Sequence, residues 1–450
     1  FSTLDTIISY YKDTIFLSLQ KSKTPLDEVV VTAQIGEESV YKSVNSFILI
    51  SKKKIQENAS NNLVDLLNTQ ALFDIQFDQS LGSALSIQGM DGNNVNILVD
   101  GIPILGRKGG QIDLGQVNLS NVDRVEILKG PAAVSYGTNS TGGVINLITN
   151  TIQSDNLTFN SYFENIGLSQ LNINSRKIVN NQNFQFNIGT YDFLGIGNEN
   201  ERSMNWNPKK QNFGDIYWEN NYDRYKIQFK SSIFEEKIID LGNENFPPFD
   251  GTAIDNHYST IRNTHYLRYN RYSDFYNINS LFSYSSTKFN KEQYYIDLIN
   301  NSSEQTTSIE YNSQDLFSSF YNRLEYNRFS SDIYKVQIGL DFNYEEVKGP
   351  KIKEGNASVF EQSFFFQSNM KITNNLNTQL GIRIPYHSIY SAPIIPSLYL
   401  KYDFSPKLTI RTSYARGFRA PSIKELFLEF IDSNHNIVGN QDLDAEKSHS

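Results

Sequence analysis

The stretch that decides the fold reads ALSIQGMDGNNVNILVDGIPILG at residues 84–106 and VDRVEILKGPAAVSYGTNSTGGVINLIT at residues 122–149. It holds three short apolar strands, which end at Ile87, run over Val95–Val99, and run over Val122–Leu128. The second strand leads into Asp100-Gly101 and the third into Gly130-Pro131, two pairs that permit tight turns. Short strands joined by glycine-containing turns predict a compact α/β unit.

The order of these elements closely resembles the plug domain of TonB-dependent outer-membrane receptors. The resemblance implies that residues 42–152 fill a barrel through which scarce, bulky nutrients are imported. Within the plug, Ser60-Asn61-Asn62 is expected to cap a helix over Leu63–Leu67, where apolar residues recur at helical spacing. The rival interpretation of the glycines, a phosphate-binding loop, requires a Gly-Lys-Ser/Thr that does not follow them.

Composition excludes several other classes. A chain of 450 residues is expected to form two or more units. The absence of cysteine excludes a disulfide framework and a thiolate metal site, and a net charge of −9 argues against a nucleic-acid partner. The sequence has no run of 18 apolar residues, so no transmembrane helix is predicted. Strands of a membrane barrel give a weaker hydrophobic signal than such a helix and are not excluded. The 30 Phe and 27 Tyr suit a barrel with aromatic girdles.

After residue 153, apolar and polar residues alternate with a period of two, as in Tyr334–Asn343 and Asn377–Ile384. This pattern predicts an antiparallel transmembrane β-barrel with lipid on one face and water or the plug on the other. Short turns also alternate with long polar segments, roughly 194–211, 235–261, 287–314, 346–358, 385–396 and 417–450. We expect about 13 strands between Asn156 and Arg416, of the about 22 found in plugged transporters. Residues 153–450 are therefore predicted to be an incomplete barrel, and the chain a fragment.

The segment before the plug has two predicted parts. Residues 1–26 resemble the last hairpin of a small β-sandwich that precedes the plug in Bacteroidetes-type receptors, so we expect a domain remnant. Residues 27–41 are expected to be a Ton box and linker. The Ton box itself, which the energy-transducing protein grips by strand addition, resembles the run Asp27, Glu28, Val29, Val30, Val31, Thr32 and Ala33. Read without the resemblance, the same residues predict a short edge strand.

Arg124, Glu126 and Lys129 are expected to alternate along one face of the third plug strand. The resemblance implies that such charges pair with acids on the inner barrel wall and hold the plug in place. Gln88 stands where many relatives have Arg, which weakens the predicted charge cluster. The alternative interpretation is a solvated charge pattern.

A second pair of motifs lies near the end of the sequence. Tyr414–Ser422 and Asn440–Leu443 resemble the two boxes that flank a histidine in haem and haemoglobin receptors, with Gln441 in a position the family gives to proline. The resemblance implies a ligand site in an external loop, formed by His435, Phe418, Arg419, Asn440 and Asp442. A neutral imidazole at His435 is a competent axial ligand for haem iron. The alternatives are a hydrogen-bonded histidine without a ligand, or ligation by His257, His265 or His387, since the plug has no histidine.

Together these observations predict a small α/β plug domain followed by an antiparallel barrel, and a receptor rather than an enzyme, because no catalytic motif occurs. The resemblance implies location in the outer membrane of a Gram-negative bacterium. It also implies energy from the TonB–ExbB–ExbD complex and haem or an iron–siderophore chelate as cargo. No resident cofactor or bound metal is expected. The alternatives are cobalamin import, a passive porin, and a glycan-binding surface component with a lipoprotein partner.

Overall fold

The computed structural model describes residues 29–36, 38–78, 82–87, 89–106, 112–149, 154–199, 201–245, 247–249, 251–307, 311–331, 333–405, 407–431 and 436–450. The predicted remnant 1–26 and the positions Asp27, Glu28, Gln88 and His435 lie outside these residues. Among the helices of the described residues, none is long and apolar enough to cross a membrane.

The first unit, up to Thr149, is built around a five-stranded sheet in the order β3-β9-β10-β7-β8. Its elements are β1 (Val29–Val30), β2 (Glu38–Ser39), β3 (Phe47–Ser51), α1 (Lys52–Glu57), α2 (Leu63–Asn68), β4 (Phe73–Asp78), β5 (Gly82–Ile87), β6 (Met90–Asp91), η1 (Gly92–Asn94), β7 (Val95–Val99), β8 (Ile102–Pro103), η2 (Leu114–Gln116), β9 (Arg124–Lys129), α3 (Ala133–Tyr136) and β10 (Gly143–Ile148). Strand β10 is parallel to β7 and antiparallel to β9. The three strands expected from the sequence are therefore present, and two of them flank β10.

Local sequence explains the start of α2 and the turn after β7. The Asn62 side chain accepts a hydrogen bond from the Asp65 amide, and the Asp65 carboxylate accepts one from the Asn62 amide, which is a capping box. Leu63, buried in the plug core, then begins the helix where it was predicted. Asp100 and Gly101 both have positive φ, +52° and +82°, which permits the two-residue turn that pairs β7 with β8.

The second unit is one long antiparallel sheet. Its path is β11 (Asn156–Glu164), β12 (Leu168–Val179), β13 (Gln182–Phe193), β16 (Lys209–Asn221), β17 (Tyr225–Asp240), β18 (Thr252–Tyr272), β19 (Tyr276–Asp297), β21 (Ser313–Ser331), β22 (Tyr334–Lys348), β23 (Asn356–Lys371), β24 (Leu376–His387), β25 (Ile395–Ser405), β26 (Leu408–Arg419) and β29 (Glu446–His449). The connections carry β14 (Ile196–Gly197), β15 (Met204–Trp206), β20 (Ser302–Gln305), η3 (Lys353–Gly355), α4 (Ile423–Phe427), β27 (Glu429–Ile431) and β28 (Asn436–Val438). In the described part of the chain, 13 strands of this path lie between residues 156 and 419, as predicted, and the path does not close.

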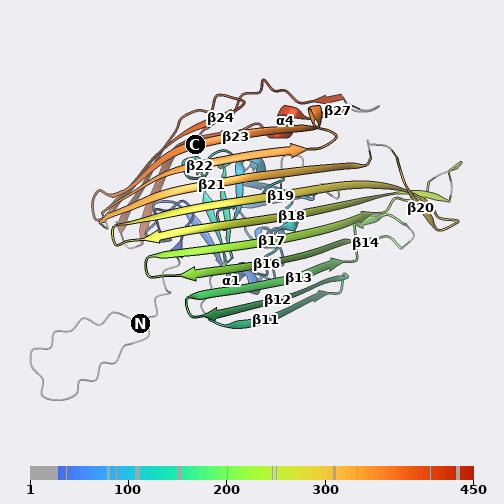
Figure 1. Ribbon diagram of the computed structural model, residues 1–450, viewed down its shortest axis with the longest axis horizontal. Coiled ribbons are helices and arrows are strands. Elements are labelled where there is room, and N and C mark those ends of the chain that lie inside the picture. The colour runs from blue at the N-terminus through green and yellow to red at the C-terminus, as the bar shows by residue number, and fades with distance from the viewer. Residues whose placement is uncertain are drawn as a thin grey trace, which may run out of the picture.

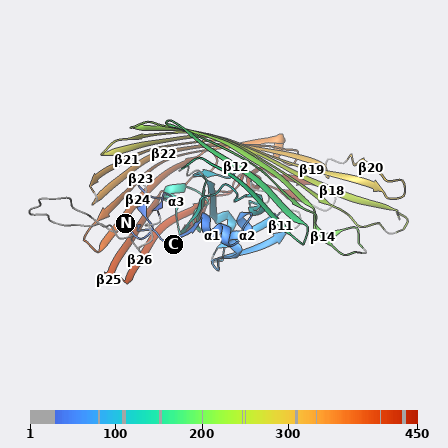
Figure 2. The same cartoon turned by 90° about the horizontal axis from the view of Figure 1, so that it is seen from below.

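The sheet curves into an arc, and the first unit lies on its concave side (Figure 2). Short turns lie at one end of the strands and the longer connections, with β14, β20 and α4, at the other (Figure 1). The two faces differ as the alternation predicted. On β22 the outward Ile338 and Leu340 are 39% and 45% exposed, whereas the inward Gln337 and Asp341 are buried. The concave face is therefore polar and the convex face apolar.

The strands are longer at the loop end than the sequence indicated. Strand β17 ends only at Asp240, and β18 already begins at Thr252. The predicted loop 235–261 is therefore shortened to residues 241–251. Beyond the apolar band both faces of these strands carry polar side chains. The hydrophobic alternation that reveals a strand therefore disappears while the backbone pairing continues.

Candidate functional site

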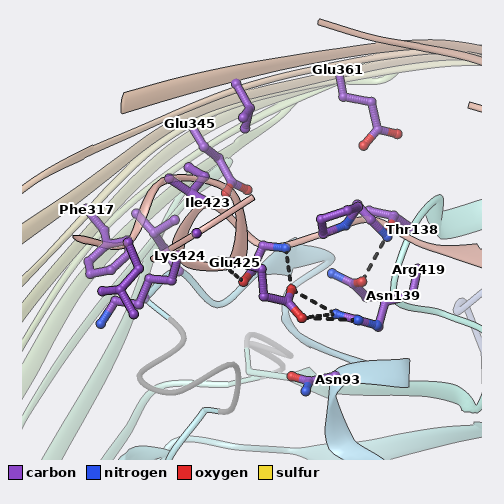
Figure 3. Close-up of a pocket in the computed structure, with 18 of the residues that line it drawn as sticks. Asn93, Thr138, Asn139, Phe317, Glu345, Glu361, Arg419, Ile423, Lys424 and Glu425 are labelled. Atoms are coloured by element: carbon purple, nitrogen blue, oxygen red, sulfur yellow. Dashed lines mark hydrogen bonds and ion pairs between the residues drawn. The ribbon is translucent and has the colours of Figure 1, made fainter. Parts of the chain in front are cut away.

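A cavity of about 430 Å³ lies at the loop end, between the plug, the wall and the connection after β26 (Figure 3). Its lining comes from three parts of the chain: Asn93, Ile104, Leu105, Gly106, Thr138 and Asn139 of the plug; Phe317, Asn343, Glu345, Val359, Glu361 and His387 of the wall; and residues 419–425, Leu428 and 437–439 of the connection. Because all three parts contribute, a molecule bound here contacts the plug and the barrel at once.

Helix α4 fixes the connection over this cavity. Ser422 caps it in a second capping box with Glu425, and Ile423 and Leu426 on its inner side are buried. Ile423 packs with Leu105 of the plug and Phe317 of the wall. The short helix thus joins three parts of the molecule through one apolar cluster.

Arg419 is the predicted ligand residue that does line the cavity. Its guanidinium lies 3.0 Å from a carboxylate oxygen of Glu425 and 2.6 Å from one of Glu446, so both charges hold the connection to the end of β26 (Figure 3 shows the Glu425 pair). Burial alone raises the pKa of Glu425, but hydrogen bonds from Arg419 and Ser422 outweigh it and the net pKa is lowered. Glu425 is therefore ionised at neutral pH.

The other predicted ligand residues are placed differently. Phe418 is buried against Val134 of α3 and Tyr390, where it supports the plug rather than facing the cavity. Asn440 donates its amide to the Glu425 carbonyl and accepts from the Asp442 amide through its side chain, so both shape the connection. His435 lies outside the described residues.

Sequence reasoning missed Glu345 and Glu361, the wall acids of the cavity. A signal existed for Glu345, because it is in phase with the inward Gln337 and Asp341 on β22. The plug residues Thr138 and Asn139 carried no comparable signal, since their place at the cavity depends on how the plug sits in the wall.

The segment predicted as a Ton box is held against the far side of the plug. The Glu126 carboxylate accepts hydrogen bonds from the Val31 amide (3.1 Å), the Thr32 amide (2.8 Å) and the Thr32 hydroxyl (2.5 Å). The Ala33 amide donates to the Tyr136 hydroxyl at 3.1 Å. Three successive amides of this segment therefore have hydrogen-bond partners, and Thr32 is fully buried.

Among the described residues, the predicted latch residues form no ion pair with the wall. Arg124 Nε lies 2.7 Å from Glu126 of its own strand, and Glu126 binds the segment described above. Lys129 falls on the opposite face of β9, because an odd step along a strand reverses the side chain, and its side chain is exposed. Arg124 and Glu126 therefore interact within the plug rather than with the wall.

The ion pairs between plug and wall in the described residues have the reverse arrangement, with the cation on the wall and the acid on the plug. Lys230 of β17 lies 3.1 Å from the Asp100 carboxylate, and both are buried. Arg323 of β21 donates to the Ser135 carbonyl at the end of α3 (2.7 Å). Burial raises the pKa of Asp100, but Lys230 and Thr149 reverse that effect, and the net pKa is lowered.

A polar-lined arc of strands around a separate α/β unit, with a cavity on one side and a clasped segment on the other, defines a plugged β-barrel transporter. Residues 38–144 match the TonB-dependent Receptor Plug Domain, and residues 114–450 match the TonB dependent receptor-like β-barrel. The chain therefore belongs to the TonB-dependent receptor family and is a receptor rather than an enzyme.

Its relatives include transporters of different cargoes. The vitamin B12 transporter BtuB of Vibrio cholerae serotype O1 is 22% identical over 456 residues, which cover 94% of this chain and 67% of that protein. BtuB of Vibrio vulnificus is 34% identical over 141 residues, 31% of this chain and 23% of that protein. A mutant of the ferric enterobactin receptor PfeA from Pseudomonas aeruginosa superposes with a TM-score of 0.73 at 18% identity, covering 94% and 69% of the two chains. The siderophore receptor PiuA of Acinetobacter baumannii gives 0.71 at 14% identity, covering 94% and 71%. At these identities the structural likeness shows the fold alone.

Proposed function

We propose that this chain imports a bulky nutrient of siderophore or cobalamin type across the outer membrane of a Gram-negative bacterium, with energy from the TonB–ExbB–ExbD complex. One observation carries the proposal: the cavity and the clasped segment meet the same short stretch of plug. Tyr136 at the end of α3 holds Ala33, and Thr138 and Asn139, two and three residues on, line the cavity.

The two sites lie far apart along the barrel. On β22, Lys335 pairs with Glu38, which follows the clasped segment, whereas Glu345 lines the cavity. Ten residues of β22 separate Lys335 from Glu345, which is about 33 Å along the strand. A cargo that contacts Asn139 would bias the hold on Ala33, because Asn139 lies three residues after Tyr136, whose hydroxyl accepts a hydrogen bond from the Ala33 amide. Release of residues 29–33 would give the energy-transducing partner a strand to pair with.

The candidate cargoes are those in the names of its relatives, vitamin B12 and ferric enterobactin. Haem ligation by His435 stays a prediction. His387 is the described histidine in the cavity, and its Nδ1 accepts from the Ile389 amide while its ring stacks on Tyr390 at 4.0 Å. Its ring is therefore already held by two wall contacts.

The test is uptake in a bacterial host that lacks its own cobalamin and siderophore receptors. The full-length protein should accumulate labelled cyanocobalamin or a ferric siderophore only when TonB is present, and deletion of residues 27–33 should abolish uptake while leaving surface binding intact. Uptake that persists without TonB would contradict the proposal and favour a passive porin.

A further inference from the structure

The cations of the cavity are already neutralised. Among the described residues, its ionisable lining consists of three acids, Glu345, Glu361 and Glu425, and two bases, Arg419 and Lys424, besides His387. Arg419 is shared between two carboxylates, as described above. Lys424 lies 3.7 Å from a carboxylate oxygen of Asp315 and over the Phe317 ring. An incoming anion would have to break these pairs to gain a cation.

The acids of the cavity are less completely neutralised than its cations. Glu361 lies 3.6 Å from the Arg383 guanidinium, which itself lies 2.6 Å from Asp341. Glu345 accepts a hydrogen bond from the Asn343 amide at 2.9 Å, a neutral donor, and no ion pair to it occurs among the described residues. The described wall residues of the cavity therefore leave Glu345 as a carboxylate without a cation partner.

The rest of the lining is uncharged. Amides and hydroxyls come from Asn93, Thr138, Asn139, Asn343 and Ser422, and apolar surface from Ile104, Leu105, Phe317 and Val359. Apolar walls with a few placed hydrogen-bonding groups suit a large, uncharged ligand with a polar periphery.

We propose that Glu345 makes this cavity reject polyanions, so that the transported cargo carries no net negative charge. The inference rests on the proposed function and narrows its substrate class. A ferric tris-catecholate has six phenolate charges around Fe³⁺ and is a trianion. An amide-rich corrinoid such as cyanocobalamin is neutral. The cavity thus favours the cobalamin alternative over a haem or catecholate cargo.

Coulomb repulsion gives the size of the effect. A trianion about 8 Å from a carboxylate at an intermediate dielectric is opposed strongly enough to weaken binding about tenfold or more at low salt. Because the Debye length is about 10 Å at 0.1 M salt and about 3 Å at 1 M, high salt should remove most of this penalty.

The experiment compares the full-length wild type with Glu345→Gln, using ferric enterobactin as the anionic probe and cyanocobalamin as the neutral one. Glu345→Gln leaves no cation unpaired. Glu346→Gln is the matched control, because the next residue of β22 points to the other face and pairs with Lys348. We expect Glu345→Gln to bind ferric enterobactin about tenfold more tightly than wild type at low salt, with cyanocobalamin unchanged and Glu346→Gln like wild type.

Equal binding of ferric enterobactin by wild type and Glu345→Gln, including none by either, would overturn the inference. So would wild-type binding that is tighter than the variant's. Failure of the proposed function has a different readout, namely absence of TonB-dependent uptake of every nutrient tested. The effect of the Glu345 charge on binding could be measured in that case as well.

Discussion

At the scale of single residues, Glu126 is the group on which the N-terminal segment depends. Its fully buried carboxylate accepts hydrogen bonds from the Val31 and Thr32 amides and forms an ion pair with Arg124. A hydrogen bond to a charged group contributes about 1.5–3 kcal/mol. The neutral side-chain amide of Gln cannot replace all three charge-assisted interactions of the carboxylate. Glu126→Gln should therefore release residues 29–33.

Hydrogen exchange of the full-length protein in detergent would measure this release. We expect the Val31 and Thr32 amides to exchange at least tenfold faster in Glu126→Gln than in wild type. Glu57→Gln, which removes an exposed carboxylate on α1, should leave them unchanged. Unaltered protection in Glu126→Gln would mean that other contacts hold the segment.

Tyr136 should titrate abnormally. Burial raises the pKa of its hydroxyl to about 12, with a smaller opposing contribution from Arg323. The hydroxyl therefore stays neutral at physiological pH and remains an acceptor for the Ala33 amide. The difference in absorbance at 295 nm between wild type and Tyr136→Phe should rise near pH 12. A rise near pH 10, the value of an exposed tyrosine, would show that the ring is not buried in solution.

At the scale of elements, the hold between β17 and the β7–β8 turn is a buried ion pair. Removing Lys230 leaves the buried Asp100 carboxylate with the hydrogen bonds from Thr149 but without its ion-pair partner. Breaking such a pair costs about 3–5 kcal/mol. Because the pKa of Asp100 is lowered on folding, its contribution is present above the ordinary carboxylate pKa and is lost as pH falls through the lowered value. In the Lys230→Met variant the plug should be loosened already at neutral pH. In the wild type it should be loosened only in strong acid.

Protease susceptibility of residues 100–106 would report the loosening. Lys230→Met combined with Asp100→Asn should recover most of the wild-type resistance, because the Asp100 carboxylate that lost its ion-pair partner is then replaced by a neutral amide. Lys237→Met, which removes an exposed lysine from the same strand, is the matched control. Equal resistance of Lys230→Met and wild type would show that the pair does not hold the plug.

Elements were more predictable from sequence than the contacts between them. The helix at Leu63 and the strand at Val95–Val99 follow from caps and apolar runs within a few residues, so local physics suffices for both. The latch was not predictable in the same way, since Lys230 and Asp100 are 130 positions apart. Their meeting depends on the register of the whole wall, which no local pattern contains.

At the scale of the whole molecule, the plug and the arc form one polar interface. Buried amides cross it repeatedly, as in Asn45 to Gln379 at 2.8 Å and Gln367 to Ser135 at 2.8 Å. Neutral hydrogen bonds contribute about 0.5–1.5 kcal/mol each and exchange readily with water. Such hydrogen bonds hold the plug at rest and can be replaced by water when it is pulled. The largest apolar cluster lies within the plug, and smaller ones join it to the wall at Leu105 and Val134.

Import should therefore require the plug to move against the wall, and the cysteine-free chain allows a clean test. Ser135→Cys with Gln367→Cys, joined by a short reducible bis-thiosulfonate reagent, should abolish uptake of the cargo and recover it after reduction, with surface binding unchanged throughout. Asn172→Cys with Asn187→Cys, joined in the same way, is the control, because both residues belong to neighbouring wall strands. Full uptake through the cross-linked Ser135–Gln367 pair would mean that the cargo passes an unmoved plug, and that the clasp at Glu126 serves stability rather than transport.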